Sequence, residues 1–284
     1  MALTINTNIA SLVAQSNLNN ATKLLNKSIE RMTTGYKINH ASDNAAGYSI
    51  SKSWETQISS LDIAADNAAT GADMLATLED TYSLISSHLQ RVRDLTEQAA
   101  NGTYGTQSLK AIKAEMTSRL EEVDRIAANC EFNGLKMMDG SMGEISLQVG
   151  LYSSADSRIT LSADLFKKAD INSLFKKDID ALASACSGLT TGTSANSMLT
   201  SIDSVINEIS GRVTTLGAAQ NRIDSAVESI SVQSENLTSS LSTLRDADVA
   251  DESSNYIKAQ ILQQAAATLL ATANQSPSIA LNLL

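Results

Sequence analysis

Charge is missing from both ends of this 284-residue chain. Residues 1–22 and 259–284 contain no Asp, Glu, Lys or Arg, so every charged residue lies between Lys23 and Lys258. Both ends nevertheless repeat apolar residues at helical spacing. Those positions are Leu18, Ala21, Leu25, Ile29 and Met32 near one end, and Ile257, Ile261, Ala265 and Leu269 near the other. Because an exposed helix ordinarily carries charge on its wet face, the two ends are predicted to be helices buried together inside an assembly.

Helix breakers and aromatic residues are also scarce. Proline occurs once, at Pro277, glycine thirteen times, and aromatic residues make up 4% of the chain. A core must therefore rest on Leu, Ile, Val, Met and Ala, which is typical of long packed helices rather than of a globular enzyme. The net charge of −10 argues against a nucleic-acid partner, which selects a basic face.

Membrane and secretory signals are absent from the sequence pattern. No stretch reaches the roughly 20 continuous apolar residues of a membrane helix, and Gln263, Gln264 and Asn274 interrupt the uncharged C-terminal segment. The opening residues lack the basic start and apolar run of a cleaved secretory signal. We therefore expect either a cytosolic protein or one exported by a route that leaves its N-terminus intact, with no membrane partner.

Residues that could carry chemistry are few and scattered. The two cysteines, Cys130 and Cys186, are too few for a disulfide framework and are expected to be small buried hydrophobes. The two histidines, His40 and His88, stand in no zinc-binding motif, and no phosphate-binding glycine loop or nucleophile motif occurs. The sequence therefore predicts no enzyme, no metal and no cofactor.

Three long helices are predicted from heptad spacing. From Ile202 to Leu244, eleven of thirteen positions at alternating steps of four and three are apolar, which indicates a rod of about 65 Å at 1.5 Å per residue. A second seam runs from Ile58 to Ala99 and is expected to end at Asn101-Gly102. A third runs from Leu109 to Cys130 and is expected to stop near Asn133-Gly134.

Only one segment has the residue pattern of β-strands. Apolar residues alternate at 145–149 and again at 159–163, separated by turn residues, which predicts a β-hairpin within 144–164. Residues 167–197 mix small and polar residues and are expected to form a loop-like tip. The predicted fold is mainly α: a long antiparallel helical hairpin or coiled-coil bundle with a small β-hairpin.

Six segments then resemble bacterial flagellin, in the family's order. They are INTNIASLVAQSNLN near the start, ERMTTGYKINHASDNAAGYSIS at 30–51, LQRVRDLTEQAANGTY at 89–104, EFNGLKMMDG at 131–140, NRIDSAVESI at 221–230 and AQILQQAAATLLATANQSP at 259–277. The resemblance implies a filament subunit with an inner domain (1–45 with 246–284) and an outer helical rod (46–166 with 198–245). Residues 167–197 would be a short variable tip.

The resemblance also implies partners and sites. The subunit would polymerise with itself, be secreted to the extracellular flagellum without a cleaved signal, and meet an export chaperone at its C-terminal segment as well as filament cap and junction proteins. The expected polymerisation residues are Leu18, Leu25, Ile29, Ile257, Ile261 and Leu269. The expected contacts with an innate immune Toll-like receptor are Gln90, Arg91, Leu95 and Glu115.

Two alternatives stay open at this point. The chain could be a hook–filament junction protein that shares the terminal helices, or a secreted coiled-coil adapter with the same helical pattern. Arg91 and Glu115 could equally serve contacts between subunits, because a surface buried in a polymer is accessible only in monomers.

Overall fold

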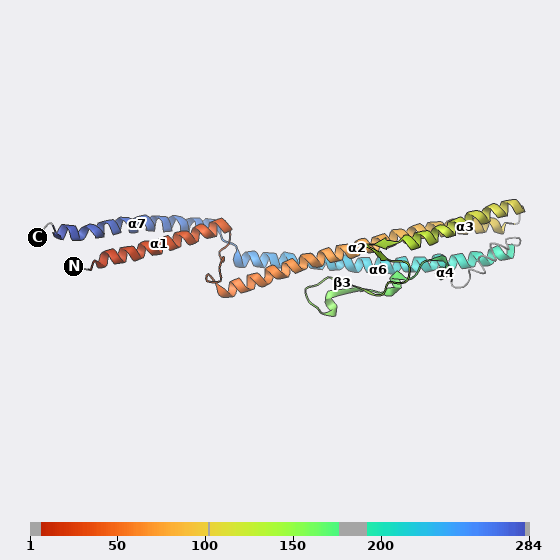
Figure 1. Cartoon of the computed structure of the whole chain (residues 1–284), viewed down its shortest axis with the longest axis horizontal. Coiled ribbons are helices and arrows are strands. Elements are labelled where there is room, and N and C mark those ends of the chain that lie inside the picture. Colours follow the sequence, from red (N-terminus) through yellow and green to blue (C-terminus); the bar gives the residue numbers. More distant parts are fainter. Residues whose placement is uncertain (1–6, 102, 176–191, 282–284) are drawn as a thin grey trace. The chain divides into compact units, whose positions relative to one another are not determined.

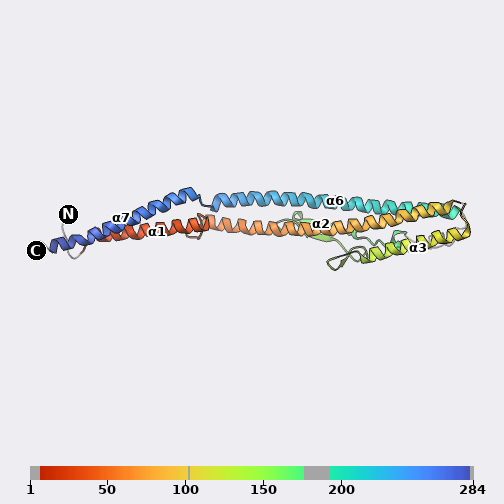
Figure 2. The same cartoon turned by 90° about the horizontal axis from the view of Figure 1, so that it is seen from above.

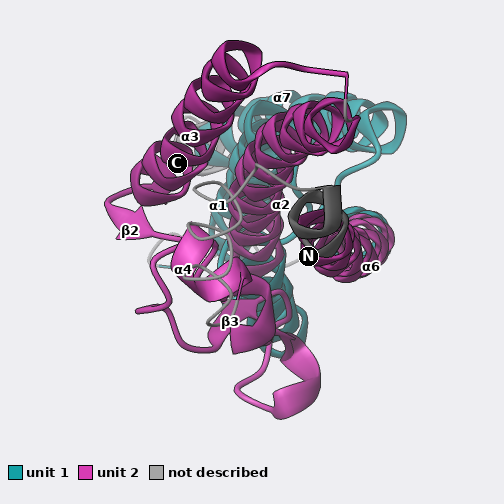
Figure 3. Ribbon diagram, turned by 90° about the vertical axis from the view of Figure 1, so that its right-hand side faces the viewer, with its two compact units in different colours: residues 1–58, 235–284 teal, residues 59–234 magenta. Residues whose placement is uncertain are grey.

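The computed structural model describes residues 7–101, 103–175 and 192–281 (Figure 1). Two compact units divide the chain, one made of Met1–Ile58 and Glu235–Leu284 and the other of Ser59–Ser234 (Figure 3). The helices are α1 (Ile9–Thr34), α2 (Ala45–Ala100), α3 (Thr106–Asn129), α4 (Ile171–Leu174), α6 (Gly192–Arg245) and α7 (Val249–Leu281). The mainly helical fold predicted from the sequence is confirmed. The division into inner and outer domains at residues 45 and 246 stays a prediction.

In the first unit, α1 and α7 lie side by side and run antiparallel (Figure 1). Asn8 caps α1 by accepting a hydrogen bond from the Ser11 backbone N–H at 3.1 Å. At the other end, Gly35 adopts a left-handed φ of 75° and its N–H donates to the Arg31 carbonyl. The two chain ends therefore pair, as expected from their matched lack of charge.

Arg245 joins the ends of several elements of the first unit. Its backbone carbonyl accepts from the Lys37 N–H at 2.7 Å, and the Gly35 carbonyl accepts from the Ala247 N–H at 2.8 Å. The Arg245 guanidinium lies 4.1 Å from the centre of the Tyr36 ring and is ion-paired with Glu55. These contacts hold the segment after α1 against the junction between α6 and α7.

In the second unit, α2 packs between α3 and α6 (Figure 2). Side-chain contacts fix both pairings as antiparallel: Arg91 and Thr81 of α2 contact Glu115 and Cys130, while Arg93 and Glu79 contact Asp203 and Gln220. The seam predicted on α2 is buried at Leu61, Ala68, Leu75, Leu78, Tyr82, Ile85, Leu89, Val92 and Ala99. On α6, the buried positions of the predicted seam recur every seven residues at Ile202, Ile209, Leu216, Ile223 and Ile230.

Two small antiparallel sheets complete the second unit. The predicted hairpin is confirmed: β3 (Ile145–Gln148) pairs with β4 (Arg158–Leu161), with Ile145 opposite Leu161. It packs close to α2, since a Cβ on Gly71 would lie 2.4 Å from a Leu147 methyl carbon. Short 3₁₀ turns at Ala155–Ser157 and Ala163–Phe166 flank β4.

The other sheet corrects the expected end of α3. The helix ends at Asn129, and β1 (Glu131–Phe132) then pairs with β2 (Leu135–Lys136). Asn133 and Gly134 occupy the turn with φ values of 48° and 81°. Two consecutive positive φ angles are what a two-residue hairpin turn requires, so Asn-Gly makes a hairpin here and does not stop a helix.

The expectation of a loop-like tip is wrong for residues 167–175. Ala169, Leu174 and Phe175 are buried, and α4 lies within this stretch. Apolar residues every few positions pack it on the core, although its small and polar residues resemble a loop. Gly192 to Ser197, also assigned to the tip, begin α6. Residues 176–191 lie outside the described part of the chain.

Arg212 of α6 anchors the start of that stretch. Its Nη1 donates to the carbonyls of Lys167 and Lys168, both at 3.2 Å, and its Nη2 donates to Glu208 at 2.8 Å. From α3, the Asp124 carboxylate accepts a hydrogen bond from the Ile171 N–H at 2.7 Å. Helices α3 and α6 thus both hold this segment through its backbone.

Candidate functional site

Small residues fill the seam between α1 and α7. On α1 the buried positions are Ala14, Ala21 and Ser28, and on α7 they include Ala259 and Ala266. Each set recurs every seven residues, so it stays on one helix face. Because these side chains are short, the two helices bury little apolar carbon against each other.

Polar contacts along the seam fix its register. Near the free ends, the Asn8 side chain donates to the Ala273 carbonyl at 2.7 Å and the Ser11 hydroxyl donates to Asn274 at 2.7 Å. In the middle, Gln263 donates to the Thr22 hydroxyl at 3.2 Å. At the other end, Arg31 pairs with the buried Glu252 at 3.5 Å.

Large apolar side chains of the same two helices remain exposed outside the seam. These residues, hereafter the assembly surface, are Ile9, Leu12, Val13, Leu24, Ile29, Met32, Val249, Ile257, Ile261, Leu262 and Leu269. Ile257, Ile261 and Leu269 are 52%, 60% and 62% exposed. An exposed apolar area of this kind marks an interaction site in soluble proteins.

The predicted polymerisation residues divide into two groups. Ile29, Ile257, Ile261 and Leu269 belong to the assembly surface, whereas Leu18 and Leu25 are half-buried beside the seam. Sequence reasoning missed the rest of the assembly surface because it followed a single apolar stripe. It also missed most of the small-residue seam, although the seven-residue recurrence of Ala259, Ala266 and Ala273 is visible in the sequence.

A charged cluster holds the loop that follows α1. The Lys27 ammonium lies 2.7 Å from Asp43, whose carboxylate also accepts from the backbone N–H groups of Asn39 and His40. The hydrogen bond from Lys27, with those backbone donors and against the effect of burial, lowers the pKa of Asp43 to about 2. His40 is largely exposed, and its Nε2 lies 2.8 Å from Glu30 Oε1.

The helices at the two ends of the chain match the helical regions of a known protein family. The family model described as the bacterial flagellin N-terminal helical region matches residues 5–142, and the one for the C-terminal helical region matches residues 199–284. A flagellin of Halalkalibacterium halodurans is 34% identical over 280 residues, covering 99% of each chain. The chain belongs to the bacterial flagellin family.

Other relatives agree with this assignment. The flagellin of Bacillus subtilis is 33% identical over 304 residues and covers 99% of each chain. Among solved structures, a putative flagellar hook-associated protein from Vibrio parahaemolyticus superposes with a TM-score of 0.59, covering 72% of this chain and 100% of that one. At 14% identity, that likeness concerns the fold alone.

The residues expected to meet an immune receptor lie on α2 and α3 of this flagellin. Gln90 and Arg91 are exposed, and Arg91 donates to Glu115 across the two helices at 3.0 Å. Leu95 is 2% exposed and belongs to the core, so it supports this surface from beneath and offers no contact area.

Within residues 7–101, 103–175 and 192–281, no group of three His, Cys, Asp or Glu could hold a metal ion. None of the helices described is long and apolar enough to cross a membrane. Cys130 is buried, and burial raises the pKa of its thiol, so little reactive thiolate forms at neutral pH. Cys186 lies outside the described residues.

Proposed function

We propose that this chain is the structural subunit of a bacterial flagellar filament, and that its copies polymerise by burying the assembly surface of α1 and α7 in one another. The observation that carries the proposal is the inverted arrangement of that pair, with small residues between the helices and large apolar residues outside. A helix pair that is stable by itself would place Leu and Ile in its own seam.

The energetics favour association. Burying one exposed Leu or Ile is worth about 1.5–3 kcal/mol. The eleven residues of the assembly surface are 40–68% exposed, so completing their burial is worth about half of that value each, or about 8–17 kcal/mol together. This gain is comparable with the about 4–15 kcal/mol that association costs in lost freedom. Repeated contacts between different patches on neighbouring copies generate a helical polymer when successive copies do not close into a ring.

Filament subunit is a better fit than the alternatives. Relatives that carry the name flagellin align over essentially the whole chain, which supports a filament role over a junction role. A coiled-coil adapter would need neither this full-length match nor an apolar exterior on its terminal helices.

Export and its partners belong to the same proposal. A subunit with this exterior must reach the extracellular filament without aggregating, so an export chaperone would cover the α7 part of the assembly surface beforehand. Cap and junction proteins would meet the same helices at the two ends of the filament. The role is structural and requires no enzyme activity or cofactor.

Seeded elongation tests the proposal. Fragments of filament are mixed with monomer, and growth is followed by sedimentation and electron microscopy. We expect deletion of 259–284 to abolish growth while the second unit unfolds as before. Leu269→Ala should slow growth strongly, whereas Gln260→Ala, on an exposed polar residue of the same helix, should not. Growth of the deletion variant at the normal rate would contradict the proposal.

We also propose that the free monomer presents Gln90, Arg91 and Glu115 to an innate immune receptor of the Toll-like class. The supporting observation is the exposed Arg91–Glu115 pair, which bridges two helices and offers a fixed arrangement of charge. Arg91→Ala should weaken receptor binding by monomer, and Lys110→Ala, on an exposed residue of α3, should leave it unchanged. Equal receptor binding by the two variants would contradict this proposal and would favour a role for Arg91 and Glu115 in contacts between subunits.

A further inference from the structure

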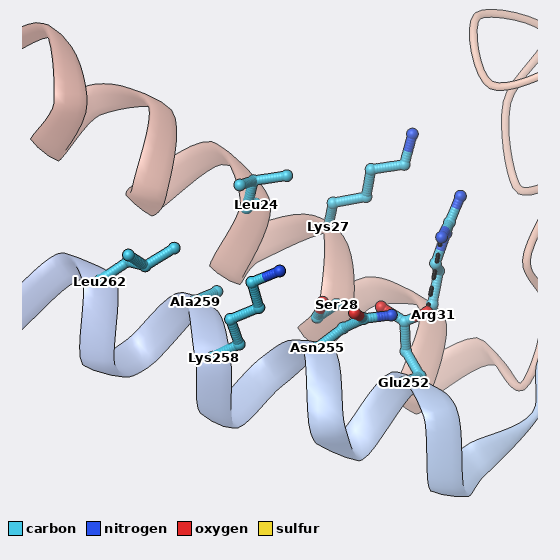
Figure 4. A pocket seen from close by; sticks show the side chains of 9 residues that line it. All are labelled: Leu24, Lys27, Ser28, Arg31, Glu252, Asn255, Lys258, Ala259 and Leu262. Atoms are coloured by element: carbon cyan, nitrogen blue, oxygen red, sulfur yellow. Dashed lines mark hydrogen bonds and ion pairs between the residues drawn. The ribbon is translucent and has the colours of Figure 1, made fainter.

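A groove of about 240 Å³ lies between α1 and α7, within the first unit. Ser28 and Ala259 form its floor, because the short seam side chains leave space above them. Lys27, Arg31 and Lys258 line it (Figure 4). One carboxylate, Glu252, lines the groove with them.

Two of these cations, Arg31 and Lys258, are incompletely satisfied within the subunit. Arg31 reaches Glu252 only at 3.5 Å, and its buried Nε has no hydrogen-bond partner. Lys27 is bonded to Asp43. In the part of the chain that the structure describes, no ion pair or hydrogen bond engages the Lys258 ammonium. A buried unpaired donor is costly, so the groove favours an added acceptor, above all an anionic one.

The mouth of the groove indicates what carries that anion. Leu24 and Leu262, which are 54% and 45% exposed, border it and belong to the assembly surface. An apolar border suits a carboxylate on an aliphatic stem better than a free inorganic ion. The chain itself supplies such groups in excess, with 31 acidic against 21 basic residues.

We propose that the Lys27–Arg31–Lys258 groove receives an Asp or Glu side chain from a second copy of this chain. This inference rests on the proposed polymerisation and adds a polar contact to it. The apolar assembly surface supplies most of the association energy, but it does little to fix the relative orientation of two copies. A carboxylate that enters this groove and bonds to Lys258 restricts the relative position of two copies, and so favours the correct contact.

Substitution of Lys258 tests the inference in seeded elongation. Lys258→Gln should raise the monomer concentration needed for growth by about tenfold, the effect of losing one charge-assisted hydrogen bond. Lys258→Arg should remain within about twofold of wild type. The matched control is Lys23→Gln, which removes the same charge from an exposed position of α1 outside the groove and should change growth by less than about twofold. Equal helix content by circular dichroism verifies that each variant folds.

The outcomes separate the two proposals. Wild-type monomer that fails to grow on its own seeds would overturn the proposed function. Normal wild-type growth with equal behaviour of Lys258→Gln and Lys23→Gln would overturn the groove alone. A third arm replaces chloride with succinate at constant ionic strength. If succinate accelerates wild-type growth and Lys258→Gln abolishes that acceleration, the ligand is a free dicarboxylate and the assignment to a second copy is wrong.

Discussion

Replacing Arg212 should destabilise the second unit far more than replacing any exposed arginine of α6. The Arg212 side chain is 9% exposed and donates to two backbone carbonyls and to Glu208. Arg212→Met keeps the buried stem but leaves these acceptors without their donor. Losing such a set costs about 2–4 kcal/mol.

Thermal unfolding followed by circular dichroism measures the effect. For a unit of this size, each kcal/mol corresponds to a fall in Tm of about 2–4 °C, so we expect a decrease of roughly 5–15 °C. Arg222→Met is the matched control, since Arg222 is exposed on the same helix, and it should cost less than about 0.5 kcal/mol. Arg212→Lys, which keeps the charge without the planar fork, should fall between the two.

Hydrogen exchange locates the effect. The Ala169 amide donates to the Met138 carbonyl at 3.1 Å, and this bond depends on the segment that Arg212 holds. Its exchange should accelerate in Arg212→Met and remain unchanged in Arg222→Met. If the two variants share the same Tm and the same exchange pattern, Arg212 does not anchor residues 167 and 168.

Three further predictions concern the first unit. Ala266→Leu should lower the temperature at which filaments dissociate, because overpacking the seam costs about 1–3 kcal/mol. Ala267→Leu, on the exposed face next to it, should leave that temperature unchanged. Equal dissociation temperatures for the two variants would mean that the seam is loosely packed. Because the folded pKa of Asp43 is lowered from 3.8 to about 2, the stability it contributes is complete above pH 4 and is lost as pH falls towards 2, so an acid titration of Asp43→Asn should be flatter than wild type in that window. Limited proteolysis should trim free monomer towards Lys23 and Lys258 but spare both ends in filaments, since the seam alone buries little apolar carbon; equal resistance in both states would refute this.

The sequence was most informative where apolar residues repeat over many turns. The seams of α2 and α6 and the alternation in β3 and β4 predicted their elements because burial follows such periods directly. It was least informative where one local signal fits two structures. Asn133-Gly134 is compatible with a helix stop and with a hairpin turn, and only the pairing of Phe132 with Leu135 decides between them.

The candidate site was predictable in its location but not in its orientation. Absence of charge identified α1 and α7, yet it could not say which apolar residues meet within the pair and which remain outside. Ala21 and Leu25 both fit the same helical stripe, and the structure buries Ala21 more deeply. Packing against a specific partner makes that choice. The groove was also hidden, because Lys27 and Lys258 are 231 residues apart in the chain.

The seven-residue repeat of the seam would allow α7 to slide along α1. Ala259 and Ala266 are interchangeable partners for α1, so a shift of α7 by one repeat, about 10.5 Å at 1.5 Å per residue, would replace alanine by alanine at nearly equal cost. Side chains that do not repeat every seven residues oppose such a slip. Their polar contacts form in one register of the two helices and would be lost after a shift; they involve Asn8 and Ser11 at one end, Gln263 in the middle and Glu252 at the other end.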